Sequence, residues 1–592
     1  MSNNISNPAE LASIIALEKL FNTIDEKKCF RLEAGAGAGK TYSLIKALKY
    51  LISKKGNSLL KNNQKIACIT YTNVAKDEIN ARTDNHPVIY ADTIHAFSWS
   101  LIRGLQKQMR EFIPSISVKW ENRINEAGGI KEQTVIYDLG YPKATTKEIT
   151  LHHDDVIKIF TFFLDIDKFR TKLKSNFPII FIDEYQDTNK DLADSIVRNL
   201  IEKDSEILVG FFGDHWQKIY GSTACGLINA SQGKIQEIGK NANFRSDRII
   251  VDMLNRMRPE LPQNFCDPAS LGEINIFHSN DWEGTRRTEN HWQGDLPARI
   301  AHNCLTKTKE LLSHKGWEFT PDKTKILMLT NNVLAEEQGY INLITAFSNT
   351  DDYLKGNDHY IKFLKDVVEI ICYLFEKRQY GEMFKAIGTN TPRLTNRKDK
   401  VVWNHDLQKL MKLRETGTIG EVLDLLTKTK KPRLSSKVEQ AEKRYSQFSQ
   451  LTKLEEIEQE QSFYDKVSAI KSTSYKELSA LARYIDDKTP FSTKHGVKGA
   501  EFENVLVVCG RGWNNYNWSQ FLEWSSNGIP KNKEDTFERN RNLFYVACSR
   551  PRKRLAILFT QLLSTGAQKT LNHWFDGENI HNLKFDDVGL CE

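Results

Sequence analysis

Residues 34–41 read AGAGAGKT and decide the fold. They follow a short apolar segment, residues 29–33, and precede a segment with helical spacing that starts at Tyr42. Glycines here let the backbone curl so that its N–H groups face a phosphate, and the start of the following helix adds positive potential. The pattern therefore predicts a nucleotide-phosphate loop, in which Lys40 reaches the β- and γ-phosphates and the Thr41 hydroxyl binds Mg²⁺.

An acidic segment downstream completes this prediction. Residues 178–182 (PIIFI) form an apolar run typical of a buried strand, and the overlapping sequence FIDEYQD, residues 181–187, carries Asp183 and Glu184. An Asp in this place is the usual Mg²⁺ anchor of P-loop enzymes, and the adjacent Glu can take a proton from an attacking water. The two segments together predict hydrolysis of ATP or a similar nucleotide.

The alternation of short apolar runs and helical patterns predicts parallel sheets covered by helices on both faces. Two long stretches break the alternation: one is mostly helical by pattern with no clear series of strands, and the other is charged and helical. We therefore expect an α/β fold with two cores, each carrying a mainly helical insertion. The predicted division is 1–97 and 177–240 for the first core, 98–176 for its insertion, 241–354 and 486–592 for the second core, and 355–485 for its insertion.

Composition narrows the class of protein. The 592 residues are 40% hydrophobic and 10% aromatic, which excludes a mainly disordered chain. No apolar run approaches the ~18 residues that span a bilayer, and the first residues lack the pattern of a secretion signal, so we expect no membrane association. The nine cysteines form no C-x-x-C pair, which fits a cytoplasmic protein. The net charge of +7 permits a nucleic-acid partner without demonstrating one.

Beyond the phosphate loop, the chain resembles the superfamily 1A helicases of the UvrD/Rep/PcrA type in seven segments that occur in the family's order. These segments are ITYTNVAKDEI (69–79), ADTIHAF (91–97), FIDEYQDT (181–188), GDHWQKIY (213–220), NFRS (243–246), TKHGVKGAEF (493–502) and RNLFYVACSR (541–550). The resemblance implies two RecA-like P-loop cores, ATP as substrate with Mg²⁺ as cofactor, and single-stranded or tailed DNA as partner.

The resemblance also implies roles at the nucleotide site. Gln217 would read the γ-phosphate and position water, while Arg245 and Arg550 would clamp that phosphate from the second core. A surface ion pair is the alternative for each Arg. Glu501 would contact the ribose and Phe244 would stack on the base. The predicted nucleotide-binding residues are Ala34, Gly35, Gly37, Gly39, Lys40, Thr41, Tyr42, Phe244 and Glu501, the catalytic residues are Lys40, Glu184, Gln217, Arg245 and Arg550, and the metal ligands are Thr41 and Asp183.

A second group of residues matches family positions along single-stranded DNA. Hydroxyl, amide and imidazole groups suit phosphate oxygens without reading sequence, and aromatic rings offer faces on which any base can stack. Core packing is the alternative for each ring. For Phe97 the two interpretations are equally favoured, and for Tyr71 and Tyr220 DNA contact is favoured. The predicted DNA-binding residues are Tyr71, Thr72, Asn73, Thr93, His95, Phe97, Tyr220, Thr493 and His495.

Several positions depart from the family's pattern. Ala34 stands where the strict phosphate-loop pattern has Gly, and Tyr42 stands where Arg often follows GKT. No Gln occurs in residues 1–40, where the family usually has one that reads adenine, so NTPs other than ATP are expected as substrates too. Residues 221–224 stand where the family often has a further aromatic and an Arg-Gly pair, so one base-stacking element of the translocation ratchet is expected to be missing. Both insertions are short, and a small second insertion disfavours strong processive unwinding while leaving translocation intact.

The prediction from the sequence is an NTP-driven motor on single-stranded DNA, moving 3′ to 5′ by resemblance. The alternative is an NTP-hydrolysing sensor of DNA ends that acts with a nuclease partner, similar to the UvrD-like subunits of Gabija-type anti-phage systems. A non-catalytic scaffold is disfavoured, because Lys40, Asp183, Glu184, Gln217 and Arg550 are all present.

Overall fold

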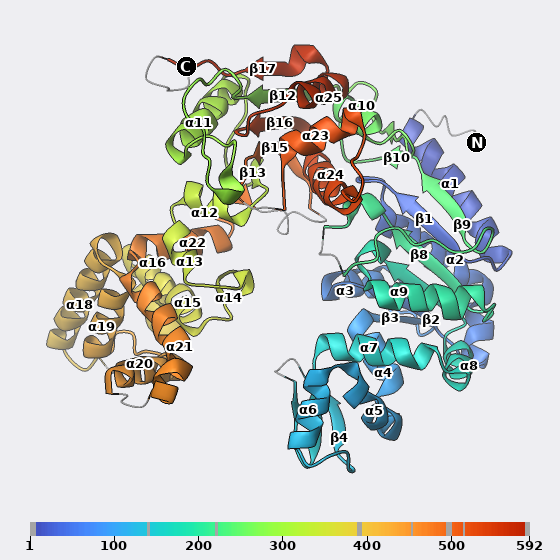
Figure 1. Cartoon of the computed structure of the whole chain (residues 1–592), viewed down its shortest axis with the longest axis horizontal. Coiled ribbons are helices and arrows are strands. Elements are labelled where there is room, and N and C mark those ends of the chain that lie inside the picture. Colours follow the sequence, from blue (N-terminus) through green and yellow to red (C-terminus); the bar gives the residue numbers. More distant parts are fainter. Residues whose placement is uncertain are drawn as a thin grey trace.

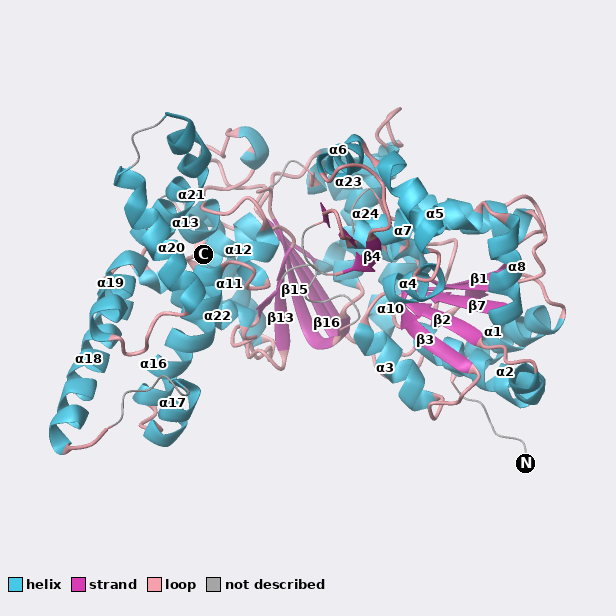
Figure 2. Ribbon diagram, turned by 90° about the horizontal axis from the view of Figure 1, so that it is seen from below, coloured by secondary structure: helices cyan, strands magenta, loops and turns pink. Residues whose placement is uncertain are grey.

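Two six-stranded sheets of parallel strands organise the chain (Figure 1). The computed structural model describes residues 7–138, 142–219, 223–387, 394–450, 454–492, 500–512 and 515–586. Figure 2 shows the two sheets side by side, with a helical part of the chain beyond the second sheet. The α/β class with two RecA-like cores is confirmed.

The first sheet brings three predicted motifs to one edge. Its order is β3-β2-β7-β8-β1-β9 and every pair is parallel. Because β7, β8 and β1 are neighbours, the phosphate loop, the acidic pair and the segment of Gln217 all leave the sheet at its carboxyl edge. The strands are β1 (Phe30–Ala34), β2 (Ile66–Thr70), β3 (Ile89–Thr93), β7 (Ile179–Asp183), β8 (Leu208–Gly213) and β9 (Gln236–Lys240). The helices of this core are α1 (Pro8–Asp25), α2 (Lys40–Lys61), α3 (Asn73–Arg82) and α9 (Lys190–Ile196).

The second sheet has the order β14-β13-β15-β16-β12-β17, again with all pairs parallel. The segments that hold Glu501 and Arg550 precede β15 and β16, so they lie at the amino edge of this sheet. The strands are β12 (Glu273–His278), β13 (Thr324–Met328), β14 (Phe491–Ser492), β15 (Phe502–Cys509), β16 (Pro551–Phe559) and β17 (Ile580–Asn582). The helices are α10 (Arg248–Met257), α11 (Ala298–His314), α12 (Asn331–Gln338), α13 (Ile341–Thr345), α23 (Trp518–Asn527), α24 (Glu534–Cys548) and α25 (Thr565–Phe575).

Each sheet is buried on both faces, as parallel sheets usually are. Alternate residues of β7 belong to different apolar clusters: Phe181 packs with residues of α2, whereas Ile180 and Ile182 pack with the first insertion. The second sheet repeats this arrangement, with one face against α10, α24 and α25 and the other continuous with the second insertion. Each insertion therefore shares an apolar core with its own sheet.

The first insertion corrects one expectation from the sequence. It contains the predicted helices α4 (Ile94–Ile102), α5 (Gln106–Phe112), α6 (Val118–Glu126), α7 (His153–Leu164) and α8 (Asp167–Asn176). It also contains a small mixed sheet of β4 (Thr134–Tyr137), β5 (Lys143–Ala144) and β6 (Glu148–Leu151), where no strand series was expected. Strands of two to four residues are too short for the alternation of apolar and polar residues to be recognised.

The second insertion is helical throughout its described residues and projects on the same side as the first (Figure 1). It comprises α14 (Thr350–Leu354), α15 (His359–Phe363), α16 (Ile370–Glu376), α17 (Tyr380–Ile387), α18 (Arg397–Thr416), α19 (Ile419–Thr429), α20 (Ser436–Gln447), α21 (Leu454–Ser472) and α22 (Tyr475–Ile485). The residue limits that divide cores from insertions stay predictions. Among the described helices, none is both long and apolar enough to cross a membrane.

Candidate nucleotide and DNA sites

The phosphate loop leaves β1 and enters α2 through two left-handed glycines. Gly37 and Gly39 have φ of 75° and 74°, a conformation that side chains other than Gly rarely adopt. A Cβ at Gly37 would also lie 2.6 Å from Asn243 Oδ1. Ala34 is the last residue of β1 and does not have positive φ, so its methyl group is compatible with the loop.

Lys40 and the acidic pair meet at the carboxyl edge of the first sheet. The Lys40 Nζ lies 3.0 Å from Glu184 Oε2. Burial lowers the pKa of Lys40, but the carboxylates of Glu184, Asp214 and Asp183 hold it above its usual value. The charge of Lys40 is thus compensated by the carboxylate that is the candidate catalytic base.

Asp183 fits the role of metal ligand. It is the last residue of β7 and is 7% exposed, and its Oδ1 is buried without a hydrogen-bond partner. Burial and the adjacent Glu184 raise its pKa to about 7. A buried carboxylate oxygen without a donor is suited to a divalent cation. Together with the Thr41 hydroxyl in the first turn of α2, this carboxylate would hold Mg²⁺.

The predicted γ-phosphate residues of the two cores come together. Arg550 is 1% exposed, and its Nη2 donates to Gln217 Oε1 over 3.2 Å. Burial and the nearby Arg245 lower the pKa of Arg550 to about 9. Arg245 donates from Nη1 to Ser549 O over 2.9 Å, and its Nε lies 3.2 Å from Glu501 Oε2. The predicted ribose residue is therefore an ion-pair partner of one predicted arginine.

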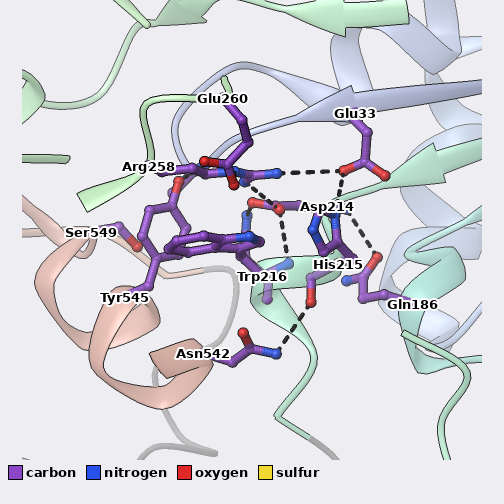
Figure 3. A network of polar contacts seen from close by, with 12 residues as sticks. Glu33, Gln186, Asp214, His215, Trp216, Arg258, Glu260, Asn542, Tyr545 and Ser549 are labelled. Carbon is purple, nitrogen blue, oxygen red and sulfur yellow. Dashed lines mark hydrogen bonds and ion pairs between the residues drawn. The ribbon is translucent and has the colours of Figure 1, made fainter. Parts of the chain in front are cut away.

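A buried network that the sequence did not reveal connects Asp214 of the first core to Arg258 of the second (Figure 3). Gln217 Nε2 donates to Asp214 Oδ2 over 2.8 Å, and Asp214 Oδ1 lies 2.6 Å from Arg258 Nη1. Arg258 follows α10 and is 2% exposed. Burial raises the pKa of Asp214, but the charges of Arg258 and Lys40 hold it below its usual value. The network thus links Gln217, the candidate water-positioning residue, to side chains of both cores.

Aromatic rings complete the network. Two guanidinium groups lie over the Trp216 ring, with Arg258 at 5.1 Å and Arg541 at 4.1 Å from its centroid. The hydroxyl of Tyr545, on α24, accepts a 3.4 Å hydrogen bond from the backbone N–H of Ala36 in the phosphate loop. Such stacked cations form favourable contacts when they are desolvated. Asp183 ends one buried strand and Asp214 directly follows another, a signal that was available in the sequence, whereas nothing there pointed to Arg258.

Replacing Arg258 with Met is expected to lower the free energy of unfolding by about 3–5 kcal/mol, because Asp214 would keep a buried charge without its partner. The change should also reduce NTP hydrolysis, because Gln217 is held by Asp214. Urea unfolding followed by tryptophan fluorescence checks the stability. The matched control is Arg256→Met, because Arg256 is two residues from Arg258 and forms a more exposed ion pair with Asp576; this change should cost about 0–1 kcal/mol. Equal stability of the two variants would contradict a buried ion pair.

Two aromatic rings among the predicted nucleotide-binding residues are accessible. Tyr42 is 47% exposed and Phe244 is 42% exposed, and both lie beside Gly39 of the phosphate loop. The backbone N–H of Phe244 donates to Gly37 O over 2.9 Å. Exposed rings attached to a phosphate loop are placed to stack on the base of a bound nucleotide.

The described DNA-binding candidates of the first core lie in one region. Tyr71 is 44% exposed, and Thr72 and Asn73 are exposed at the start of α3. A cavity of about 420 Å³ is lined by Tyr71 and His95 together with Asp183. Burial and the nearby His153 lower the pKa of His95 to about 4, so this imidazole is neutral at pH 7.

Two threonines among these candidates also have structural roles. The Thr72 hydroxyl accepts from Ala75 N over 3.2 Å and caps α3, and the Thr93 hydroxyl accepts from Ala96 N over 3.4 Å and caps α4. Capping fixes where these helices begin.

Phe97 is a core residue, and its assignment to DNA binding is wrong. Its ring is 1% exposed and packs against Tyr90, Phe160 and Phe177. A ring buried in this way cannot stack on a base. Tyr220, Thr493 and His495 lie outside the described residues.

Comparison with known families agrees with this geometry. Residues 18–223 match the model of an AAA domain, and residues 138–561 match the model of the UvrD-like helicase C-terminal domain, which covers well over half of the chain. The chain belongs to the UvrD-like helicase family.

Two relatives differ in how much of the chain they match. The Gabija protein GajB of Bacillus cereus (strain HuB5-5) is 25% identical across 92% of this chain and 95% of its own length. The ATP-dependent DNA helicase PcrA of Staphylococcus epidermidis is 26% identical across only 38% of this chain and 37% of its own length. The similarity to PcrA is therefore limited to part of this UvrD-like chain, whereas the similarity to the Gabija protein extends over nearly all of it.

Proposed function

We propose that this UvrD-like helicase is an NTP-driven motor on single-stranded DNA that moves 3′ to 5′. The contact of Arg550 with Gln217 carries the proposal, because it joins groups of the two cores at the place where a γ-phosphate would lie. An arginine from a second core completes the site only when the cores are together. NTP hydrolysis would thus be coupled to closure and opening of the cores, which shifts their grips along the strand.

The described residues would have separate roles in hydrolysis. Lys40 and the backbone N–H groups of the phosphate loop bind the β- and γ-phosphates. A phosphate bound at Lys40 would replace Glu184 as its partner and leave that carboxylate to take a proton from water. Asp183 and Thr41 would hold Mg²⁺, which supplies positive charge against the developing charge on the phosphates. Arg245 and Arg550 would add further positive charge from the second core.

The second candidate function is a DNA-end-activated NTPase that works with a nuclease partner in anti-phage defence. Similarity to a Gabija protein over nearly the whole chain favours it, since similarity to PcrA covers a much smaller part. The same residues would hydrolyse NTPs, but the output would be nucleotide consumption or activation of the partner. The cytoplasm is the proposed location for either function.

One experiment separates the two functions. Hydrolysis of ATP and of GTP by the purified chain is measured with and without single-stranded DNA, and displacement of a labelled strand is followed from 3′-tailed and 5′-tailed duplexes. The motor requires DNA-stimulated hydrolysis with displacement from the 3′-tailed duplex. Hydrolysis stimulated by DNA ends without displacement would support the sensor instead. Displacement from the 5′-tailed duplex alone would contradict the proposed direction.

Tyr71 is expected to contribute to DNA binding by stacking on a base. Tyr71→Ala should weaken binding of a single-stranded oligonucleotide about 5- to 100-fold, which corresponds to the ~1–3 kcal/mol of one base–aromatic contact. Fluorescence anisotropy of a labelled oligonucleotide measures the change. Tyr373→Ala is the control, because Tyr373 is 49% exposed but lies on the second insertion. Unchanged affinity in the Tyr71 variant would remove this residue from the DNA site.

A further inference from the structure

A buried lysine lies against the phosphate loop and has no role in the mechanism above. Lys240 is the last residue of β9, where it is in register with Ala34 of β1. It is 0% exposed. Its Nζ donates to Gly39 O over 3.2 Å and to Ser43 Oγ over 2.8 Å. The ammonium group is thus held at the junction of the phosphate loop and α2.

Among the described residues, this ammonium group has no carboxylate partner. In the described part of the chain, Lys240 forms no ion pair with a carboxylate, and burial lowers its pKa to about 8. Buried charges in proteins are normally paired, because an isolated charge is costly to remove from water. The phosphate loop therefore has an uncompensated positive charge in addition to Lys40, whose charge is balanced by Glu184.

The rings of Tyr42 and Phe244 flank the ammonium group. Its Nζ lies 5.4 Å from the centroid of Tyr42 and 5.8 Å from that of Phe244. A Cβ at Gly39 would lie 3.5 Å from Lys240 Nζ, 3.7 Å from Tyr42 Cβ and 4.0 Å from Phe244 Cδ2, so all three side chains meet at one glycine. Lys240 is therefore at the end of the phosphate loop where the base of a nucleotide would stack.

We propose that Lys240 binds the α-phosphate of the nucleotide substrate. This phosphate lies between the base, which the exposed rings of Tyr42 and Phe244 would stack against, and the β- and γ-phosphates, which Lys40 would bind. Lys40 is the only cation in the first turn of α2. That turn therefore offers the α-phosphate no cation apart from the lysine that would bind the β- and γ-phosphates. The inference rests on nucleotide binding in the proposed function, and it assigns a positioning role to a residue on a different strand from the phosphate loop.

Binding of adenosine, AMP and ADP to the full chain tests the assignment by calorimetry. Lys240→Met should weaken binding of AMP and ADP about 10- to 100-fold, the range for losing a hydrogen bond to a charged group. Binding of adenosine, which has no phosphate, should change less than about twofold. Lys240→Arg keeps the charge and should retain most of the affinity. Lys46→Met is the matched control, because the Lys46 Nζ lies 5.2 Å from the same Tyr42 ring but is exposed.

Thermal melting distinguishes this role from a structural one. Removing an uncompensated buried charge should leave the melting temperature of the ligand-free Lys240→Met chain equal to or above that of wild type, while ADP should raise it less than in wild type. A structural lysine would give the opposite result, with a lower melting temperature and an unchanged effect of ADP.

The pH dependence of ADP binding gives a second readout in the wild-type chain. The ammonium form binds phosphate, so affinity should fall between pH 7 and pH 9 as Lys240 loses its proton. In Lys240→Met this fall should be absent. Among the described residues, the titratable side chain in contact with Lys240 is Tyr42, and Lys46 lies over the same ring; the Lys46→Met control tests the contribution of Lys46.

Three results would overturn the assignment to the α-phosphate. The first is equal affinity of wild type and Lys240→Met for ADP. The second is an equal loss of affinity for adenosine and for ADP, which would mean that Lys240 acts on the base. The third is a pH dependence of ADP binding that persists in Lys240→Met. A wild-type chain that binds none of the three ligands would contradict the proposed function as well. Normal ADP binding by wild type without hydrolysis would contradict only the proposed function.

Discussion

Lys40→Ala is expected to reduce NTP hydrolysis about 100- to 1,000-fold, the effect of removing one preorganised donor from a site where charge develops. Lys40 is the only described cation within ion-pair distance of Glu184. Its loss removes the group that binds the β- and γ-phosphates. It also removes the ammonium group whose charge lowers the pKa of Asp183, so that pKa should rise further. Steady-state hydrolysis with saturating single-stranded DNA measures the effect.

The control for this variant is Lys49→Ala, because Lys49 is exposed on the same helix, α2. DNA binding should be largely retained in both variants, because Tyr71 and the other described DNA-binding candidates are not part of the phosphate loop. Full hydrolysis by the Lys40 variant would contradict the assignment of residues 34–41 as a phosphate loop.

Glu184→Gln is expected to lower kcat about 100-fold or more, in the range that general-base catalysis contributes. The amide is nearly isosteric with the carboxylate and can still accept from Lys40, so binding of nucleotide and DNA should persist. The stalled chain should therefore remain on single-stranded DNA in the presence of ATP. Single-turnover hydrolysis and oligonucleotide binding, measured on the same sample, distinguish a loss of chemistry from a loss of affinity.

Glu206→Gln is a matched control for this substitution. Like Glu184, Glu206 has positive φ, 60° compared with 48°, but it lies on the surface next to Lys174. Any cost of placing Gln in a left-handed backbone is thus present in both variants. Near-normal turnover in the Glu184 variant would show that another group accepts the proton.

The sequence alone determined the class of fold and the nucleotide motifs. Residues 34–41 and 181–188 specify strand–loop–helix units by local spacing, and the structure places both at one sheet edge, since their strands are separated only by β8. The resemblance to the helicase family, rather than spacing, implied that Arg550 and Gln217 would face the same phosphate, and the structure places them 3.2 Å apart. The short strands of the first insertion were missed because two to four residues carry too little pattern.

Only the tertiary structure decided which side chains are buried and which charges meet. Tyr71 and Phe97 are both aromatic residues of DNA-binding motifs, yet one is 44% exposed and the other 1%. Asp214 pairs with Arg258 across 44 residues, and Lys240 reaches Gly39 across 201. Burial and charge pairing depend on which strands and helices the fold places side by side. The spacing of residues along the chain does not reveal these contacts, because the partners come from separate elements that meet only once the chain has folded.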